Sequence, residues 1–204
     1  MRHRSKRWPL GPSSTGRYGK AVSTVWAITY SSSKNHHHPL PQRTPKITDS
    51  VVIERILDAP VELIWKMWTE SEHFAAWYGP MGASIPVAKM DVQVGGGRHI
   101  CVAMETPNGP MQMWFVGEFT EIVANKRLVY TESMSDEDGN IISPSQMGMP
   151  EGHPETTQII VELAPVDAKT KMTMTHVGVP AGSPGASGWG MAFDKLATYA
   201  ASRV

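Results

Sequence analysis

Cysteine is almost absent from this sequence of 204 residues, which holds only Cys101. A single thiol cannot form an intramolecular disulfide, and it cannot supply the cysteine pairs on which many structural zinc sites depend. This sparing use of cysteine is typical of proteins in a reducing compartment. We therefore expect a cytoplasmic protein.

Long apolar runs are also missing. The longest apolar patch near the N-terminus, residues 25–28, is far shorter than the roughly 18 residues of a membrane-spanning helix. It is also too short for the core of a secretory signal. We expect a soluble protein without a membrane span.

Acidic side chains are absent from residues 1–48, which carry nine Lys and Arg. The other 156 residues carry ten basic and nineteen acidic side chains, a formal charge of −9. Binding to nucleic acid needs a clustered positive surface that displaces counterions from phosphate. An acidic body does not offer one, so we expect no nucleic-acid partner for the folded part.

Residues 1–46 are basic and rich in Ser and Pro, a composition that cannot bury a core and predicts a disordered extension. Two interpretations stay open. The stretch is typical of an organellar transit peptide, and it is equally typical of an extension from a misassigned start. The three adjacent histidines, residues 36–38, lack the fixed geometry of a specific metal site, and we assign no metal.

Residues 47–204 predict one α+β domain. A β-branched strand over residues 50–57 is followed by Pro60, which suits the first position of a helix. Apolar residues then recur at helical spacing and predict an inward face: Val61, Ile64, Trp65 and Trp68. A second short helix, capped by Ser71 and ended by Gly79-Pro80, follows at once.

Six further strands are predicted, separated by Gly and Asn turns: residues 85–94, 98–105, 111–121, 128–132, 156–164 and 171–177. Connections this short require antiparallel neighbours, because a parallel crossover needs about a dozen residues. The pattern predicts an antiparallel meander. It ends in a helix capped by Ser187, with one apolar stripe that includes Trp189 and Phe193.

Several short motifs occur in a distinctive order along the domain: Asp58-Ala59-Pro60, Trp68-Thr69, Trp77-Tyr78-Gly79-Pro80, Val94-Gly95-Gly96, Leu128-Val129-Tyr130-Thr131 and Gly188-Trp189. Together they resemble the activator-of-heat-shock-protein-ATPase branch of the START-like helix-grip superfamily. The resemblance implies a curved antiparallel sheet wrapped around a long C-terminal helix, with two short helices after the first strand. It implies a partner that is a small hydrophobic molecule or a heat-shock chaperone. A homodimer is left open.

The resemblance also implies a mostly apolar cavity between the sheet and the last helix. Met172, Met174 and His176 share one parity on the last strand, so these three side chains are expected to point inward. His176 is then a ligand-binding group, a general base or a satisfied histidine at the rim. The segment 133–155 is expected to overhang the cavity. We expect the following residues to contact a ligand: Trp68, Trp77, Met104, Met113, Trp114, Met174, His176, Trp189 and Phe193.

Catalytic motifs are missing. The sequence holds no Gly-x-Ser-x-Gly elbow, and Gly95-Gly96-Gly97 lacks the Lys and Ser or Thr of a phosphate loop. We assign no catalytic residue and no cofactor, and we favour a binding domain. Two alternatives stay open: a cyclase or hydrolase acting on an aromatic or polyketide-like substrate, and a pure protein-interaction module.

Overall fold

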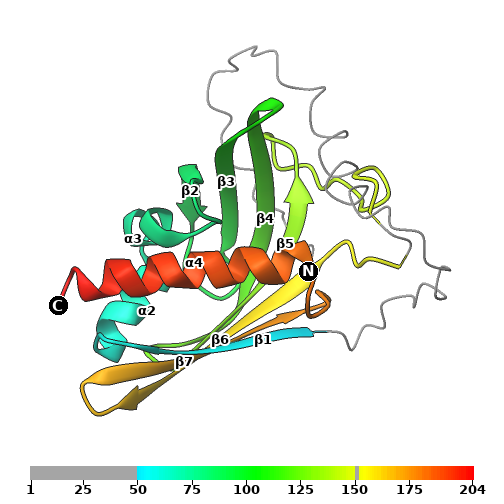
Figure 1. Cartoon of the computed structure of the whole chain (residues 1–204). Helices are drawn as coiled ribbons and strands as arrows, with labels where there is room; N and C mark the ends of the chain where they lie inside the picture. Colours follow the sequence, from blue (N-terminus) through cyan, green and yellow to red (C-terminus); the bar gives the residue numbers. More distant parts are fainter. Residues whose placement is uncertain (1–49, 150–151) are drawn as a thin grey trace, which may run out of the picture.

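The computed structural model describes residues 50–149 and 152–204, so the predicted extension over residues 1–46 lies outside the described residues. The described chain forms a seven-stranded antiparallel sheet that curves around a long C-terminal helix (Figure 1). Two short helices follow the first strand. The α+β helix-grip fold predicted from the sequence is therefore confirmed.

The elements follow one another along the chain in this order: β1 (Ser50–Leu57), α2 (Val61–Thr69), α3 (Ser71–Trp77), β2 (Ser84–Met90), β3 (Gly97–Thr106), β4 (Gly109–Val123), β5 (Arg127–Ser135), β6 (Thr157–Val166), β7 (Lys169–Val177) and α4 (Pro184–Ala201). In the sheet the strand order is β1-β7-β6-β5-β4-β3-β2. The first strand therefore pairs with the last, and β1 and β2 form the two edges.

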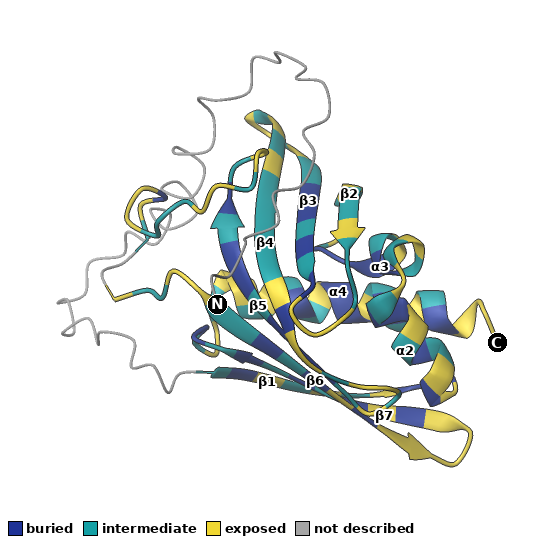
Figure 2. Ribbon diagram, turned by 180° about the vertical axis from the view of Figure 1, so that it is seen from behind, coloured by how far each residue is buried: buried dark blue, intermediate teal, exposed yellow. Residues whose placement is uncertain are grey.

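Tight hairpin turns explain why most strands pair in the sheet with the strand that follows them in the sequence. Asn125 between β4 and β5 and Asp167 between β6 and β7 have φ angles of 61° and 54°. Asn and Asp enter this left-handed region more easily than other non-glycine residues. The turn at Asn125 was predicted. Figure 2 shows exposed residues at the tip of the β6–β7 hairpin and buried ones along the strands.

The start of α4 differs from the prediction. The helix begins at Pro184, and the Ser183 hydroxyl accepts a hydrogen bond of 3.3 Å from the Ala186 amide. Ser183, and not Ser187, is the N-cap. Pro184 explains the difference, because proline fixes φ near the helical value at the first position and begins the helix one turn earlier.

The capping prediction for α3 is also wrong. Ser71 is the first helical residue, Glu70 stands at the N-cap, and no side chain caps this helix. Several strand bounds differ as well. β2 ends at Met90, where the Asp91 amide turns back to the Gly97 carbonyl, and β4 extends to Val123.

The core lies between the concave face of the sheet and the three helices. Along β7, Thr170, Met172, Met174 and His176 are buried in alternation with more exposed residues. The predicted inward parity of Met172, Met174 and His176 agrees with this burial pattern. We call this concave side the inner face and the opposite side the outer face.

Candidate functional site

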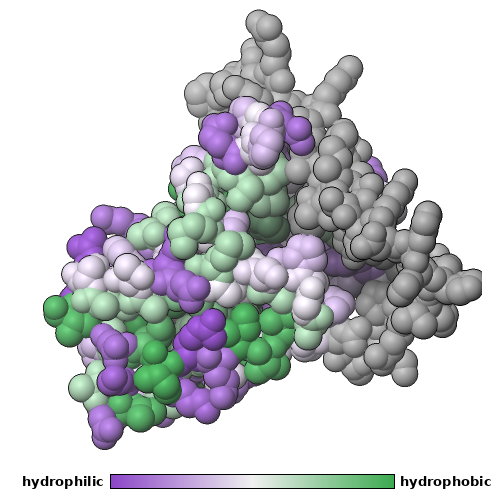
Figure 3. Space-filling model, in the orientation of Figure 1, coloured by the Kyte–Doolittle hydropathy of each residue, from purple (hydrophilic) through white to green (hydrophobic). Residues whose placement is uncertain are grey.

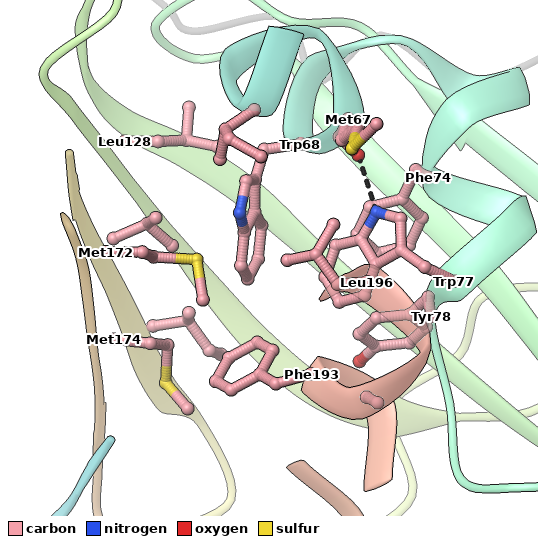
Figure 4. Close-up of a cluster of buried hydrophobic side chains, with 14 of the residues drawn as sticks. Met67, Trp68, Phe74, Trp77, Tyr78, Leu128, Met172, Met174, Phe193 and Leu196 are labelled. Carbon is pink, nitrogen blue, oxygen red and sulfur yellow. Dashed lines mark hydrogen bonds between the residues drawn. The ribbon is translucent and has the colours of Figure 1, made fainter. Parts of the chain in front are cut away.

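Three of the expected ligand contacts form the centre of the core. Trp68 of α2, Trp77 of α3 and Phe193 of α4 are almost completely buried. Their ring centroids are separated by 4.7 Å for the two tryptophans and by 6.2 Å from each tryptophan to Phe193 (Figure 4). Met174 of β7 is buried in the same cluster. These rings fill much of the space between the helices and the lower sheet.

Met104 and Met113 lie on the inner face, nearer the β3–β4 turn than the aromatic core does. Both are half-buried, and they alternate on their strands with outer-face residues. Register pairs place further apolar side chains beside them, and we call the whole set the methionine face: Met104, Met111, Met113, Phe115 and Met134. In Figure 3, moderately apolar residues occupy the upper sheet between the hydrophilic β3–β4 tip and α4. This face is a concave apolar surface beyond the end of the aromatic core.

His176 and Trp189 join β7 to the start of α4. The Trp189 indole nitrogen donates to His176 Nδ1 at 2.9 Å, and His176 Nε2 lies 2.8 Å from the Thr157 hydroxyl. Because an indole nitrogen can only donate, Nδ1 must be the unprotonated nitrogen and Nε2 carries the proton. Burial lowers the pKa of His176 below its usual 6.5. The imidazole is therefore neutral, and both of its nitrogens are already occupied.

An ion pair that sequence reasoning missed lies next to this group. Arg98 of β3 donates to the Glu132 carboxylate of β5 at 2.6 Å, and the Tyr78 hydroxyl donates to the same oxygen at 3.1 Å. Arg98 is only 3% exposed. Burial acts to lower the pKa of this guanidinium, but the surrounding Tyr130, Glu132 and Tyr78 raise it overall, so Arg98 stays charged. Burial also raises the pKa of Tyr78 and keeps it neutral.

The two groups form one hydrogen-bonded chain across the inner face. The Thr157 hydroxyl donates to the Glu132 carbonyl at 3.1 Å and also meets His176. We call the connected residues the polar belt: Tyr78, Arg98, Glu132, Thr157, His176 and Trp189. The belt runs from β3 to the second turn of α4 and borders the methionine face.

Gly117 makes the belt geometrically possible. It pairs with Arg98 and follows Val116, the partner of Ser133, so no side chain stands between Arg98 and Glu132. A Cβ atom at Gly117 would lie 1.8 Å from the Thr131 carbonyl oxygen, which is backbone and cannot move freely. A glycine is therefore required in the middle of β4.

Trp114 does not join the other expected residues. It pairs with Cys101, and its ring lies 4.9 Å from that of His99. Both of these β3 residues alternate with Arg98, whose guanidinium lies over the inner-face Tyr130 ring. Trp114 is therefore on the outer face.

The segment expected to overhang the cavity begins on the outer face as well. A Cβ atom at Gly139 would lie 3.6 Å from Val116, which is on the same side of β4 as Trp114. β5 also continues to Ser135, so the segment is shorter than expected. The expectation that it covers the inner face is wrong for this first turn.

The sequence did contain a signal for the polar belt. Arg98 has the same parity as the core residues Ile100 and Val102, which predicts an inward arginine. A buried arginine requires a carboxylate partner. The pairing of β3, β4 and β5 brings Glu132 next to Arg98 and supplies this carboxylate. What the sequence does not provide is the register that joins β3, β4 and β5.

Metal ligands are not gathered in the part of the chain that the structure describes, since no group of three or more His, Cys, Asp or Glu is suitably placed there. Among the described helices, none has the length and apolar character to span a membrane.

Comparison with known proteins identifies the family to which this architecture corresponds. The family model described as "Activator of Hsp90 ATPase homolog 1-like protein" matches residues 58–201. No curated protein matches the chain.

Solved structures of bacterial proteins share the fold. A protein from Nitrosomonas europaea has 22% identity and a TM-score of 0.58, with 76% of this chain and 95% of that chain covered. A protein from Arthrobacter aurescens has 20% identity and a TM-score of 0.62, with coverages of 78% and 90%. The AHSA1 protein from Silicibacter pomeroyi has 15% identity and a TM-score of 0.57, with coverages of 76% and 99%. At these identities the likeness concerns the fold alone.

Proposed function

The chain belongs to the family of Activator of Hsp90 ATPase homolog 1-like proteins, and we propose that its domain binds a small, largely apolar molecule on the inner face of the sheet. The methionine face is the observation that carries this proposal. Its five apolar side chains are half-buried on a concave surface, whereas the lower inner face is closed by aromatic rings.

Methionine suits such a surface. Its unbranched thioether side chain adapts to ligands of different shape and contacts aromatic rings favourably. The polar belt lies at the lower border of the methionine face and supplies the few fixed polar groups that ligand sites commonly contain. Met104, Met113, His176 and Trp189 are in this way the expected residues that best fit a ligand site.

The core side chains have a different role in this proposal. Trp68, Trp77 and Phe193 pack against one another and form the base of the site. Trp114, on the outer face, is left out of the proposed site.

The arrangement around His176 favours binding over catalysis. A general base is commonly oriented by a carboxylate and keeps one nitrogen free for the substrate. His176 instead contacts an indole nitrogen and a hydroxyl. A cyclase or hydrolase activity that depends on His176 is therefore the weaker proposal.

The binding proposal is tested with ethylbenzene as the probe. A ligand that binds only the folded state raises the melting temperature as its concentration exceeds the dissociation constant. We expect ethylbenzene to raise the melting temperature of the full chain, and we expect Met113→Glu to abolish this shift because it places a charge on the methionine face.

Met81→Glu is the matched control, since Met81 is 63% exposed and lies outside the methionine face. It should leave the shift intact. The proposal is wrong if the unaltered chain shows no shift with ethylbenzene or with acetophenone, which adds a carbonyl to a similar ring compound, or if Met113→Glu and Met81→Glu respond alike.

A second candidate function is a protein contact through the edge strand β1, as the family description of a chaperone activator suggests. Val52 and Ile56 are 60% and 55% exposed on the outer face of this strand, and among the described strands β1 pairs with β7 alone. Exposed apolar residues on an edge strand favour pairing with another chain, whether a chaperone or a second copy. Gel filtration of the unaltered chain and of the double variant Val52→Lys/Ile56→Lys distinguishes a second copy from a chaperone as the partner. A dimer that is lost in the double variant indicates self-association through β1.

A further inference from the structure

Three polar atoms on the inner side of the sheet are buried without a partner among the described residues. They are Arg98 Nη2, the Tyr130 hydroxyl and Trp68 Nε1. Buried polar groups in native proteins nearly always have a hydrogen-bond partner, so each exception requires an explanation. A fourth such atom, His99 Nε2, lies on the outer face and is not part of this group.

The three groups belong to one contact cluster. The guanidinium carbon of Arg98 lies 4.1 Å from the Tyr130 ring centroid and 5.7 Å from that of Phe74. The Trp68 ring lies 6.5 Å from the same Phe74 ring. In Figure 4 the Trp68 nitrogen turns away from Trp77, toward the side of the sheet residues Leu128 and Met172. Leu128 lies two residues before Tyr130 on the same face of β5.

The chemistry of the three groups selects their missing partner. Arginine and tryptophan nitrogens donate hydrogen bonds and cannot accept them, and a tyrosine hydroxyl can also donate. A cluster of unpaired donors therefore calls for an acceptor, most simply an oxygen atom. A buried water would accept from Arg98 and donate to the Tyr130 hydroxyl, so the titrations below must distinguish a ligand oxygen from a water.

The local charge excludes an anionic acceptor. Glu132, 2.6 Å from Arg98, already balances the guanidinium charge. A ligand carboxylate would add a second negative charge beside Glu132 in a buried setting, which is unfavourable without a further cation. A neutral carbonyl oxygen adds no charge and accepts two hydrogen bonds.

We propose that the site recognises the carbonyl oxygen of an uncharged, otherwise apolar molecule, which enters over the methionine face and is held by Arg98 and Tyr130. This inference rests on the proposed function and specifies the ligand class for it. Aryl or alkyl ketones and aldehydes of modest size belong to this class.

The test compares three probes of similar size: ethylbenzene, acetophenone and benzoate. They share a ring and differ in carrying no acceptor, a neutral carbonyl and a carboxylate. Titrations of the full chain, followed by calorimetry or by thermal shift, should rank acetophenone first, about tenfold tighter than ethylbenzene, as one or two hydrogen bonds to unpaired donors would give. Benzoate should bind weakest.

Tyr130→Phe removes one of the donors without changing the shape of the ring. Because that hydroxyl has no partner, the melting temperature of the free variant should stay the same or rise, while the preference for acetophenone over ethylbenzene falls. Tyr199→Phe is the control, since the Tyr199 hydroxyl contacts His73 at 3.0 Å and not the cluster. It should leave the preference unchanged.

Each other outcome overturns the inference in a distinct way. Equal affinity for ethylbenzene and acetophenone means that the donors are satisfied otherwise, and the proposed binding function survives alone. Tightest binding of benzoate indicates an anion site. Binding of none of the three probes removes the proposed function as well. If Tyr130→Phe does not fold, the ranking of probes by the unaltered chain still decides.

Discussion

His176 illustrates how one side chain can join distant parts of the fold through its protonation state. Its neutral form accepts a hydrogen bond from Trp189 and donates one to Thr157. Adding a proton to Nδ1 would place two donors face to face and break the contact between β7 and Trp189 in the second turn of α4. Burial also lowers the pKa of His176, because the charged form is poorly solvated there.

The free energy of unfolding should therefore depend on pH. A histidine with a lowered pKa in the folded state stabilises the fold fully above its unfolded pKa of about 6.5. As the pH falls below that value, the unfolded chain binds a proton first and the stability decreases. Urea denaturation between about pH 8 and pH 5 should show this decline. A constant or rising stability on acidification would contradict it.

His176→Gln is the informative variant, since an amide can accept from Trp189 and donate to Thr157 without titrating. It should flatten the pH dependence, although part of the decline should remain because burial lowers the pKa of His99 too. His99→Gln identifies that remaining part. An unchanged slope in His176→Gln would show that the titrating group is elsewhere.

At the scale of single elements, local signals in the sequence predicted most of the fold. Pro60 marked the first helix within one residue, and the alternating residues of β7 predicted its buried side. Contacts set by strand pairing were harder to predict. Trp114 was assigned to the same face as its neighbour Met113, although successive residues of a strand point to opposite faces. Arg98 and Glu132 meet only through the register of three strands.

The N-terminus of helix α4 allows a direct test of which serine caps it. Ser183 caps its N-terminus, and Ser187, the cap predicted from sequence, lies within the first turn. Ser183→Ala should lower the free energy of unfolding by about 1 kcal/mol, because the Ala186 amide loses its partner. Ser187→Ala is the matched control and should have little effect, since alanine is the better helix former. Equal losses in the two variants, measured by urea denaturation, would contradict the assignment of the cap.

At the scale of the whole molecule, charge divides the sequence more sharply than any motif. Nine basic residues precede residue 49, and the remaining chain carries a net charge of −9. Among the described residues, the core extends from Leu57 to Ala200, and the family model matches residues 58–201. We propose on this basis that residues 47–204 are the folding unit and that residues 1–46 lie outside it.

Deletion of residues 1–46 should accordingly leave the melting temperature unchanged, because the removed stretch lacks the apolar periodicity that a packed element requires. Thermal unfolding of both chains, at low and at high salt, measures this. If the stretch instead binds the acidic body, its removal should lower the melting temperature by more than a few degrees at low salt, and the difference should shrink at high salt because exposed charges are screened. A full-length variant with glutamine at the nine basic positions separates charge from length: a loss of stability in this variant equal to that of the deletion would assign the contact to charge alone.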